Sequence, residues 1–193
     1  RSKIPCVATA SVCLKLLVAV VAVSPTVSFA ADVSIESALP PGFEALFNGT
    51  NIDGWWGAST ENPRDYLSLP AAEFHKKHEA SLADIKKHWS VENGELVNDG
   101  NGLFLTSDRN FGDFELVLDY KTVPLADSGV YLRGCPQVQI WDSTEQAKFK
   151  LGADKGSGAL WNNSPGAPGK DPLVKADKPF GEWNPGRIVM VGS

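Results

Sequence analysis

Cysteine, methionine and histidine are all scarce in this chain. Its 193 residues include three Cys, one Met and three His. Cys6 and Cys13 fall in an apolar N-terminal region, so a chain processed after that region keeps Cys135 alone. A single cysteine excludes a framework of internal disulfides. Cys135 precedes Pro136 in a predicted turn, where a small packed residue is expected rather than a nucleophile.

Long apolar runs are also missing. The apolar run at residues 16–23 is too short to span a bilayer. Lys15 precedes it, and Ser28 and Ala30 place small residues where a signal peptidase reads the chain. We therefore predict a signal peptide at residues 1–30 and an exported domain at residues 31–193, periplasmic or extracellular. A membrane anchor is the weaker interpretation, because Pro25 and Ser28 interrupt the run.

Basic residues are in the minority. The whole chain has a net charge of −5, and without Arg1, Lys3 and Lys15 fifteen basic residues face 23 acidic ones, a net of −8. Such a surface does not favour nucleic acid or anionic lipid. We expect a small neutral ligand, no nucleic-acid partner, and no membrane partner once the signal peptide is removed.

Familiar cofactor and nucleophile motifs are absent too. The chain has no G-x-S-x-G, no P-loop and no dinucleotide fingerprint. His75 and His78 have metal-like spacing, but the lysines around them oppose a dication. Residues 98–102 loosely resemble a calcium loop without its closing Glu, which favours a plain turn. No cofactor is therefore indicated with certainty; a divalent metal is left open, with its ligands unknown.

Short alternating segments dominate what is present. Residues 114–121 alternate Phe, Leu, Leu and Tyr with Glu, Val, Asp and Lys, and Asn93-Gly94 joins two short runs in the manner of a β-hairpin. Further strands are expected near residues 43–47, 103–106 and 187–191. Many short strands with frequent turn signals predict an all-β sandwich or jelly roll.

One stretch of the chain has helical character instead. Pro70 precedes a run that is typical of a helix with proline in its first turn. Ser81 and Asp84 have the spacing of a capping box, which predicts the start of a second short helix. We therefore expect a small helical insertion at about residues 62–88 in an otherwise β chain.

The segment at residues 127–142 has the most informative pattern. Alternation predicts two strands around a Gly-Cys-Pro turn, with Val130, Leu132, Val138 and Ile140 on one face. The other face carries Tyr131, Arg133, Gln139 and Trp141, flat groups that donate or accept directed hydrogen bonds. A floor for a polar, ring-shaped ligand such as a sugar and an ordinary exposed sheet face fit this pattern equally well.

The motifs together resemble a known family. The segments GFEALFNGTNIDGWWG, HWSVENGELVNDG, FGDFELVLDYKT, DSGVYLRGCPQVQIWD, GSGALWNNSPGAPGKDPL and FGEWNPGRIVM, in this order, are similar to the exported bacterial 3-keto-disaccharide hydrolase domain. The resemblance covers nearly all of residues 42–191 and implies a concanavalin A-like lectin/glucanase jelly-roll sandwich. Pro185 departs from the family's His, and the family continues with further strands, so we expect an incomplete domain whose activity truncation could abolish.

The resemblance implies a hydrolase that acts on the glycosidic bonds of 3-keto-glycosides by elimination and water addition. Such a site needs a base, a cation or metal for the enolate oxygen, and an acid. The expected catalytic residues are Asp119, Arg133 and Asp142. The expected substrate-binding residues are Tyr131, Gln139, Trp141, Trp161, Asn162 and Asn184. A non-catalytic carbohydrate-binding module and a structural β-sandwich module are the alternatives, because a fold alone does not fix a function.

Overall fold

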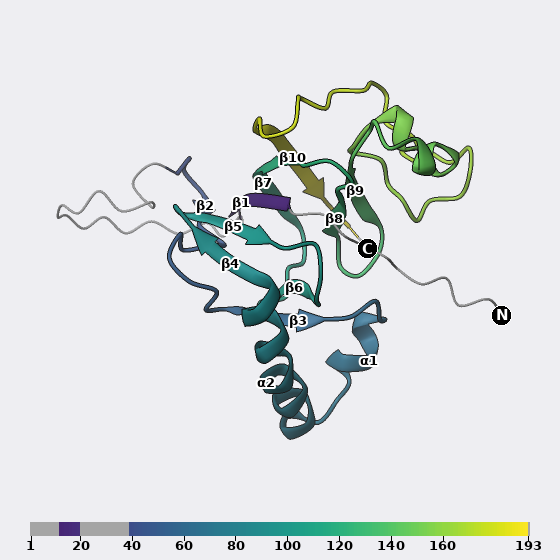
Figure 1. Ribbon diagram of the computed structural model, residues 1–193. Helices are drawn as coiled ribbons and strands as arrows, with labels where there is room; N and C mark the ends of the chain where they lie inside the picture. Colours follow the sequence, from purple (N-terminus) through teal and green to yellow (C-terminus); the bar gives the residue numbers. More distant parts are fainter. Residues whose placement is uncertain (1–11, 20–38, 193) are drawn as a thin grey trace.

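The structure is a computed structural model that describes residues 12–19 and 39–192 (Figure 1). Strands dominate, and the helices lie almost entirely in one insertion, which confirms the mainly β fold predicted from the alternation. The jelly-roll connection stays a prediction. In the described part of the chain, no helix is both long enough and apolar enough to cross a membrane.

The largest sheet has the order β10-β7-β1-β5-β4, with β2 paired to β1, and every pairing is antiparallel. Its strands are β1 (Val12–Ala19), β2 (Phe43–Glu44), β4 (Trp89–Glu92), β5 (Glu95–Asn98), β7 (Phe114–Lys121) and β10 (Asn184–Met190). The bounds of β7 agree with the predicted strand, because its alternation is uninterrupted over eight residues. Asn93 and Gly94, both with positive φ, form the predicted two-residue turn between β4 and β5.

Two smaller sheets face the large one. They are formed by β3 (Trp55–Ala58) with β6 (Phe104–Ser107), and by β8 (Asp127–Tyr131) with β9 (Gln137–Trp141). The core lies between the layers, where Leu96, Leu116 and Leu118 of the large sheet meet Trp55 of β3 and Val130 of β8. This is the side of the hairpin that the alternation assigned to the core.

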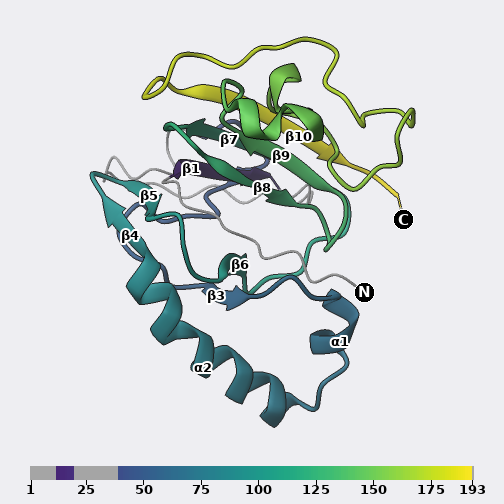
Figure 2. The same ribbon diagram turned by 45° about the vertical axis from the view of Figure 1, so that its right-hand side comes forward.

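The helical insertion packs on the outer side of β3 (Figure 2). It consists of α1 (Pro63–Leu67) and α2 (Ala71–His88). Trp56, 1% exposed, points away from Trp55 and meets aromatic rings of both helices. The insertion at about residues 62–88 is thus confirmed, and an aromatic cluster attaches it to the sandwich.

The second short helix predicted from Ser81 and Asp84 is wrong, because α2 is continuous over 18 residues. Both side chains bond to groups outside the helix. Ser81 Oγ accepts the amide of Gly57 at 2.9 Å, and Asp84 Oδ1 accepts the amide of Leu103 at 2.7 Å. The spacing that resembles a capping box instead places two polar groups on the face of α2 that meets β3 and the segment before β6.

The predicted signal peptide overlaps the large sheet. Val12–Ala19, including Cys13, Lys15 and part of the apolar run, forms β1 between β5 and β7 (Figure 1). The proposed cleavage region near Ala30 lies outside the described residues. Export and cleavage therefore stay predictions.

Candidate active site on the outer face of the β8–β9 hairpin

Cross-strand pairs define the two faces of this hairpin. Val130 pairs with Val138 and faces the core, whereas Asp127 pairs with Trp141 and Gly129 with Gln139 on the other face. We call this second surface the polar hairpin face: Asp127, Tyr131, Gln137, Gln139, Trp141 and the neighbouring Trp161. It holds three of the four side chains that alternation grouped as a sugar floor, the exception being Arg133.

The placement of Arg133 in a strand is wrong. β8 ends at Tyr131, and Arg133 lies in the turn with φ +51°, followed by Gly134 at φ +89°. The chain reverses here, so period-two alternation no longer determines where the side chain points. Arg133 is exposed and donates a hydrogen bond to the carbonyl oxygen of Gly192 at 2.6 Å. The structure does not bring it to the polar hairpin face.

The polar hairpin face is buried at the end that carries Gln139 and Trp141. The 3-10 turns η2 (Gln146–Leu151) and η3 (Ala153–Lys155) follow β9, and η2 reaches this end of the face through the contact of Lys148 with Asp127. Trp141 is 3% exposed and donates from Nε1 to the carbonyl of Gly156 at 2.9 Å. Gln139, also 3% exposed, donates to Asp127 Oδ1 at 2.8 Å. Trp141 therefore has no open ring face for a sugar.

Trp161 reaches the same face from a segment that pairs with the free edge of β9. The amide of Gln139 donates to Ala159, and the amide of Trp161 donates to Gln137, with Leu160 bridging to Val138. The Trp161 ring is half-buried and stands edge-on to Trp141, with centroids 5.6 Å apart. Lys170 Nζ lies over this ring, 4.6 Å from its centroid. Trp161 is thus the more exposed of the two indoles on this face.

The neighbouring expected residues are held in place differently. Asn162 is exposed, and its Oδ1 accepts the amide of Gln137 at 2.8 Å. Tyr131 is half-buried at the far end of β8, with its ring 5.5 Å from that of Phe104. Both residues lie at the edge of the polar hairpin face.

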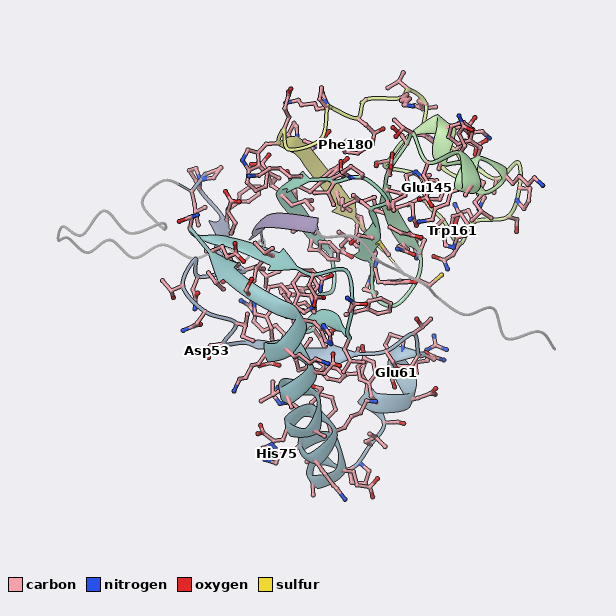
Figure 3. All side chains as sticks on the ribbon, in the orientation of Figure 1. Asp53, Glu61, His75, Glu145, Trp161 and Phe180 are labelled. Carbon is pink, nitrogen blue, oxygen red and sulfur yellow. The ribbon has the colours of Figure 1, made fainter. Side chains whose placement is uncertain are left out.

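A cation and two carboxylates converge beside Trp141. Lys148 Nζ lies 3.1 Å from Asp127 Oδ2 and 2.9 Å from Glu145 Oε2. With Gln139 on the other oxygen of Asp127, these residues form what we call the lysine–carboxylate cluster. Glu145 and Trp161 lie on the same side of the molecule, well away from His75 on α2 (Figure 3). Three separate segments, β8, β9 and η2, are needed to build it.

The charge state of the cluster follows from its contacts. Burial disfavours the charged form of Lys148, but the bonds and charges of Glu145 and Asp127 outweigh burial and raise its pKa. Lys148 therefore stays cationic across the neutral range. Glu145 Oε2 is buried, and its charged partner is Lys148 Nζ at 2.9 Å.

Asp142 and Asn184 are braces rather than exposed catalytic or binding groups. Asp142, 3% exposed, accepts the amides of Leu125 and Thr144 and the Thr144 hydroxyl. Burial raises the pKa of Asp142, but these hydrogen bonds together outweigh it and lower the pKa. Asn184, 4% exposed, donates to Tyr120 and Glu182 and accepts from Lys178. Each side chain organises the backbone of a loop.

Asp119 lies on a different surface altogether. On β7, Leu118 is buried in the core, so the adjacent Asp119 points to the opposite face of the large sheet. Glu115 and its partner Arg187 occupy that same outward face. The structure does not bring Asp119 together with the lysine–carboxylate cluster.

A cleft of about 330 Å³ has Trp141 among its lining residues. Phe180, Lys175 and Asp177 line it. Asp177 accepts from the amide and hydroxyl of Ser157. Burial raises the pKa of nearby Tyr120, the Ser157 hydrogen bond lowers it less, and the Asp177 charge raises it further. These polar groups fasten the long loop after η3 to β7.

Two of the three histidines, His78 and His88, pair with carboxylates. His78 Nε2 lies 2.9 Å from Asp108, and His88 Nδ1 lies 2.9 Å from Asp99. Within residues 12–19 and 39–192, no group of three or more His, Cys, Asp or Glu side chains could hold a metal ion.

Sequence reasoning missed the central members of the site. Asp127 stood at the edge of the highlighted segment, but neither Glu145 nor Lys148 lies in a motif. Their spacing of three was a signal for a local ion pair. The contact from Lys148 to Asp127 spans 21 residues and depends on how η2 folds over the hairpin.

The comparison with protein families decides the relationship of this chain. The family model of the 3-keto-alpha-glucoside-1,2-lyase-like domain matches residues 42–193, which is well over half of the chain. The chain belongs to this family. The match includes the whole polar hairpin face and the lysine–carboxylate cluster, whereas β1 precedes it.

A relative in this family comes from Bacteroides thetaiotaomicron and is named 3-keto-disaccharide hydrolase. It is 23% identical over 180 residues, which cover 77% of this chain and 52% of the relative. The chain thus spans about half the length of this curated relative. No solved structure matches the chain.

Proposed function

We propose that this member of the 3-keto-alpha-glucoside-1,2-lyase-like family hydrolyses 3-keto-glycosides, including 3-keto-disaccharides, at the lysine–carboxylate cluster. The observation that carries the proposal is Lys148 Nζ held between Asp127 and Glu145, at 3.1 and 2.9 Å, on the same side of the molecule as the half-buried Trp161 (Figure 3). Ligand binding alone does not require a base and a cation at one point, whereas elimination next to a ketone requires both.

The first half of the reaction is an elimination. The C3 ketone acidifies the C2 proton, and we assign Asp127, the most exposed carboxylate of the cluster, as the base that removes it. Lys148 stabilises the enolate oxygen that develops at C3. When the ketone re-forms, the C1–C2 double bond forms and the C1–O bond breaks. The departing oxygen takes the proton held by Asp127.

The second half reverses these steps with water. Asp127 takes a proton from water as the hydroxyl adds to C1, and the proton returns to C2, so the net reaction is hydrolysis. Glu145 is a positioning residue, because its carboxylate holds Lys148 charged and directed at Asp127. Trp161 provides the ring surface on which a sugar can pack.

The test compares two lysines. Lys148→Met removes the cation of the cluster, and Lys155→Met removes an exposed lysine paired with Asp171 as the matched control. With a 3-keto-disaccharide as substrate, we expect Lys148→Met to lower kcat/KM by about 10²- to 10³-fold and Lys155→Met to leave it unchanged. Turnover in D₂O should place deuterium at C2 of the released 3-keto sugar.

Three outcomes would count against the proposal. Wild-type turnover by a folded Lys148→Met variant would remove the cluster from the chemistry. Hydrolysis without deuterium at C2 would exclude elimination. Saturable binding of the 3-keto-disaccharide with no turnover by the wild type would favour the carbohydrate-binding module.

We also propose export, with cleavage near Ala30 and a periplasmic or extracellular location. The apolar run at residues 16–23 and the small residues at 28 and 30 support it. N-terminal sequencing of protein recovered outside the cytoplasm should begin within two residues of Ala31. An intact N-terminus in that fraction would contradict it.

A further inference from the structure

The strand β1 occupies a position between two strands that belong to the matched domain. Seven residues of β1 pair with β7, from Cys13 opposite Lys121 to Ala19 opposite Glu115. Three residues pair with β5, from Val12 opposite Asn98 to Leu14 opposite Leu96, so Cys13 and Leu14 pair on both sides. Both pairings are antiparallel. Because β1 has β7 on one side and β5 on the other, it is an interior strand and joins the two halves of the large sheet.

The segment that fills this position lies outside the family match. β5 and β7 fall within residues 42–193. β1 ends at Ala19, inside the predicted signal peptide, and 22 residues separate it from the start of the match. Without β1, the matched domain presents the edge of β7 on one side of the gap and the edges of β5 and of the two-residue β2 on the other. An interior gap with such edges on both sides is a template for an added strand.

The neighbours also define what the gap accepts. Leu116 and Leu118 of β7 are buried in the core, and cross-strand partners share a face. The register positions opposite Leu118 and Leu116 are those of Leu16 and Val18, so an occupant of the gap needs an apolar residue at each of these two positions. A suitable occupant is an extended segment of about seven residues, apolar at alternate positions and antiparallel to both neighbours.

We propose that the gap between β5 and β7 is a strand-acceptor site, and that Val12–Ala19 is its built-in occupant until the N-terminal segment is cleaved off. The segment then has two roles: it is part of the export signal, and in the precursor it is the strand that fills the gap in the large sheet. The first half of the proposal needs only the pairing of β1; the second rests also on cleavage. Neither depends on the chemistry assigned to the lysine–carboxylate cluster.

A proline substitution tests the pairing in the full chain. Leu14 pairs with Leu96 on one side and with Tyr120 on the other, so its amide meets a neighbouring strand whichever way it points. Leu14→Pro removes that donor. We expect hydrogen exchange of the β5 and β7 amides to accelerate by at least about tenfold. Val23→Pro, in the same apolar run but beyond the end of β1, is the matched control and should leave exchange unchanged.

A cleavable chain tests the acceptor site. With a specific protease site inserted after residue 30, cutting should leave the N-terminal segment bound without a covalent link. A fluorescent peptide of residues 10–21 with added lysines for solubility should then replace it, and the same peptide carrying Leu14→Pro should not. Equal exchange rates in the Leu14→Pro and Val23→Pro chains would overturn the strand assignment. Release of the segment without uptake of the peptide, or dimerisation that excludes the peptide, would overturn the acceptor site.

Discussion

Two surfaces of this molecule carry charged residues on strands, and they differ in what surrounds them. On the outward face of β7 and β10, Glu115 pairs with Arg187 at 2.6 Å in the open, with Asp119 on the same face. On the polar hairpin face, η2 folds over the strands and brings Lys148 between Asp127 and Glu145, with Lys148 17% exposed. Partial burial and convergence from three segments, not the presence of charge on a strand, distinguish the candidate site.

The largest contrast should appear between two aspartates. Asp127→Asn removes the proposed base and should lower kcat/KM on a 3-keto-disaccharide by about 10²- to 10⁴-fold. Asp119→Asn, on the outward face of β7, should leave it unchanged. Steady-state kinetics of the two folded variants measure this difference. A large loss from Asp119→Asn with none from Asp127→Asn would reverse our assignment of the two surfaces.

The next largest effect concerns stability on the polar hairpin face. Trp141 is buried and bonded to Gly156, so Trp141→Ala should lower the free energy of unfolding by about 3–5 kcal/mol. Trp161→Ala, at the half-buried partner ring, should cost less stability and instead weaken binding of the keto sugar. Urea unfolding and ligand titration separate the two. Equal losses of stability would show that both indoles are structural.

Alternation predicted the two faces of the hairpin but not what covers one of them. Val130 reaches the core and Gln139 and Trp141 share the other face, because pleating alone fixes that choice. The burial of Trp141 depends on later segments of the chain, among them Gly156, which accepts its Nε1–H, and Trp161, which packs against its ring. Period and spacing describe neighbours along the chain, so they carry no information about Lys148 reaching Asp127.

The roles of the polar loop residues were beyond sequence reasoning for a related reason. Asp142 and Asn184 have side chains suited to binding a sugar. Both instead form hydrogen bonds with backbone amides and carbonyls of segments that come together only in the folded chain. The prediction that Arg133 lies in a strand was wrong because β8 ends at Tyr131, two residues earlier than the alternating pattern suggested. In each case the outcome depends on a long-range contact or a turn, which the local sequence pattern does not describe.

A smaller, pH-dependent effect is expected at Asp142. Because the pKa of Asp142 is lowered in the folded protein, the unfolded state binds its proton more readily. The stabilisation is complete above the unfolded pKa of about 4 and is lost as the pH falls through the folded value. Asp142→Asn should cost about 1–3 kcal/mol at pH 7, because the Leu125 amide loses its acceptor.

Chemical denaturation of both proteins between pH 7 and pH 3 measures this effect. The difference between wild type and Asp142→Asn should shrink toward the acid end of the range. A difference that stays constant down to pH 3 would contradict the assignment of Asp142 as an ionised brace.

The smallest effect is expected on the open face. Arg187 holds the pKa of Glu115 below its usual value, and Glu115 raises the pKa of Arg187, but Arg187 is exposed and Glu115 is only half-buried. Solvent and salt screen such a pair, so Glu115→Gln should leave the melting temperature unchanged within error. A clear drop would mean that the two charged surfaces are less different than we conclude.

The pairing of residues 159–161 with the edge of β9 limits how the length of the connection between η3 and this segment can vary. Trp161 and Leu160 are consecutive residues of a segment hydrogen-bonded to Gln137 and Gln139, so they point to opposite faces. If the segment slid along β9 by one residue to take up a change in the length of the connection from η3, the two side chains would exchange faces, placing an indole in the core and a leucine beside Trp141. Length variation before Ala159 should therefore occur in steps of two residues, or be absorbed in the turns nearer Gly152.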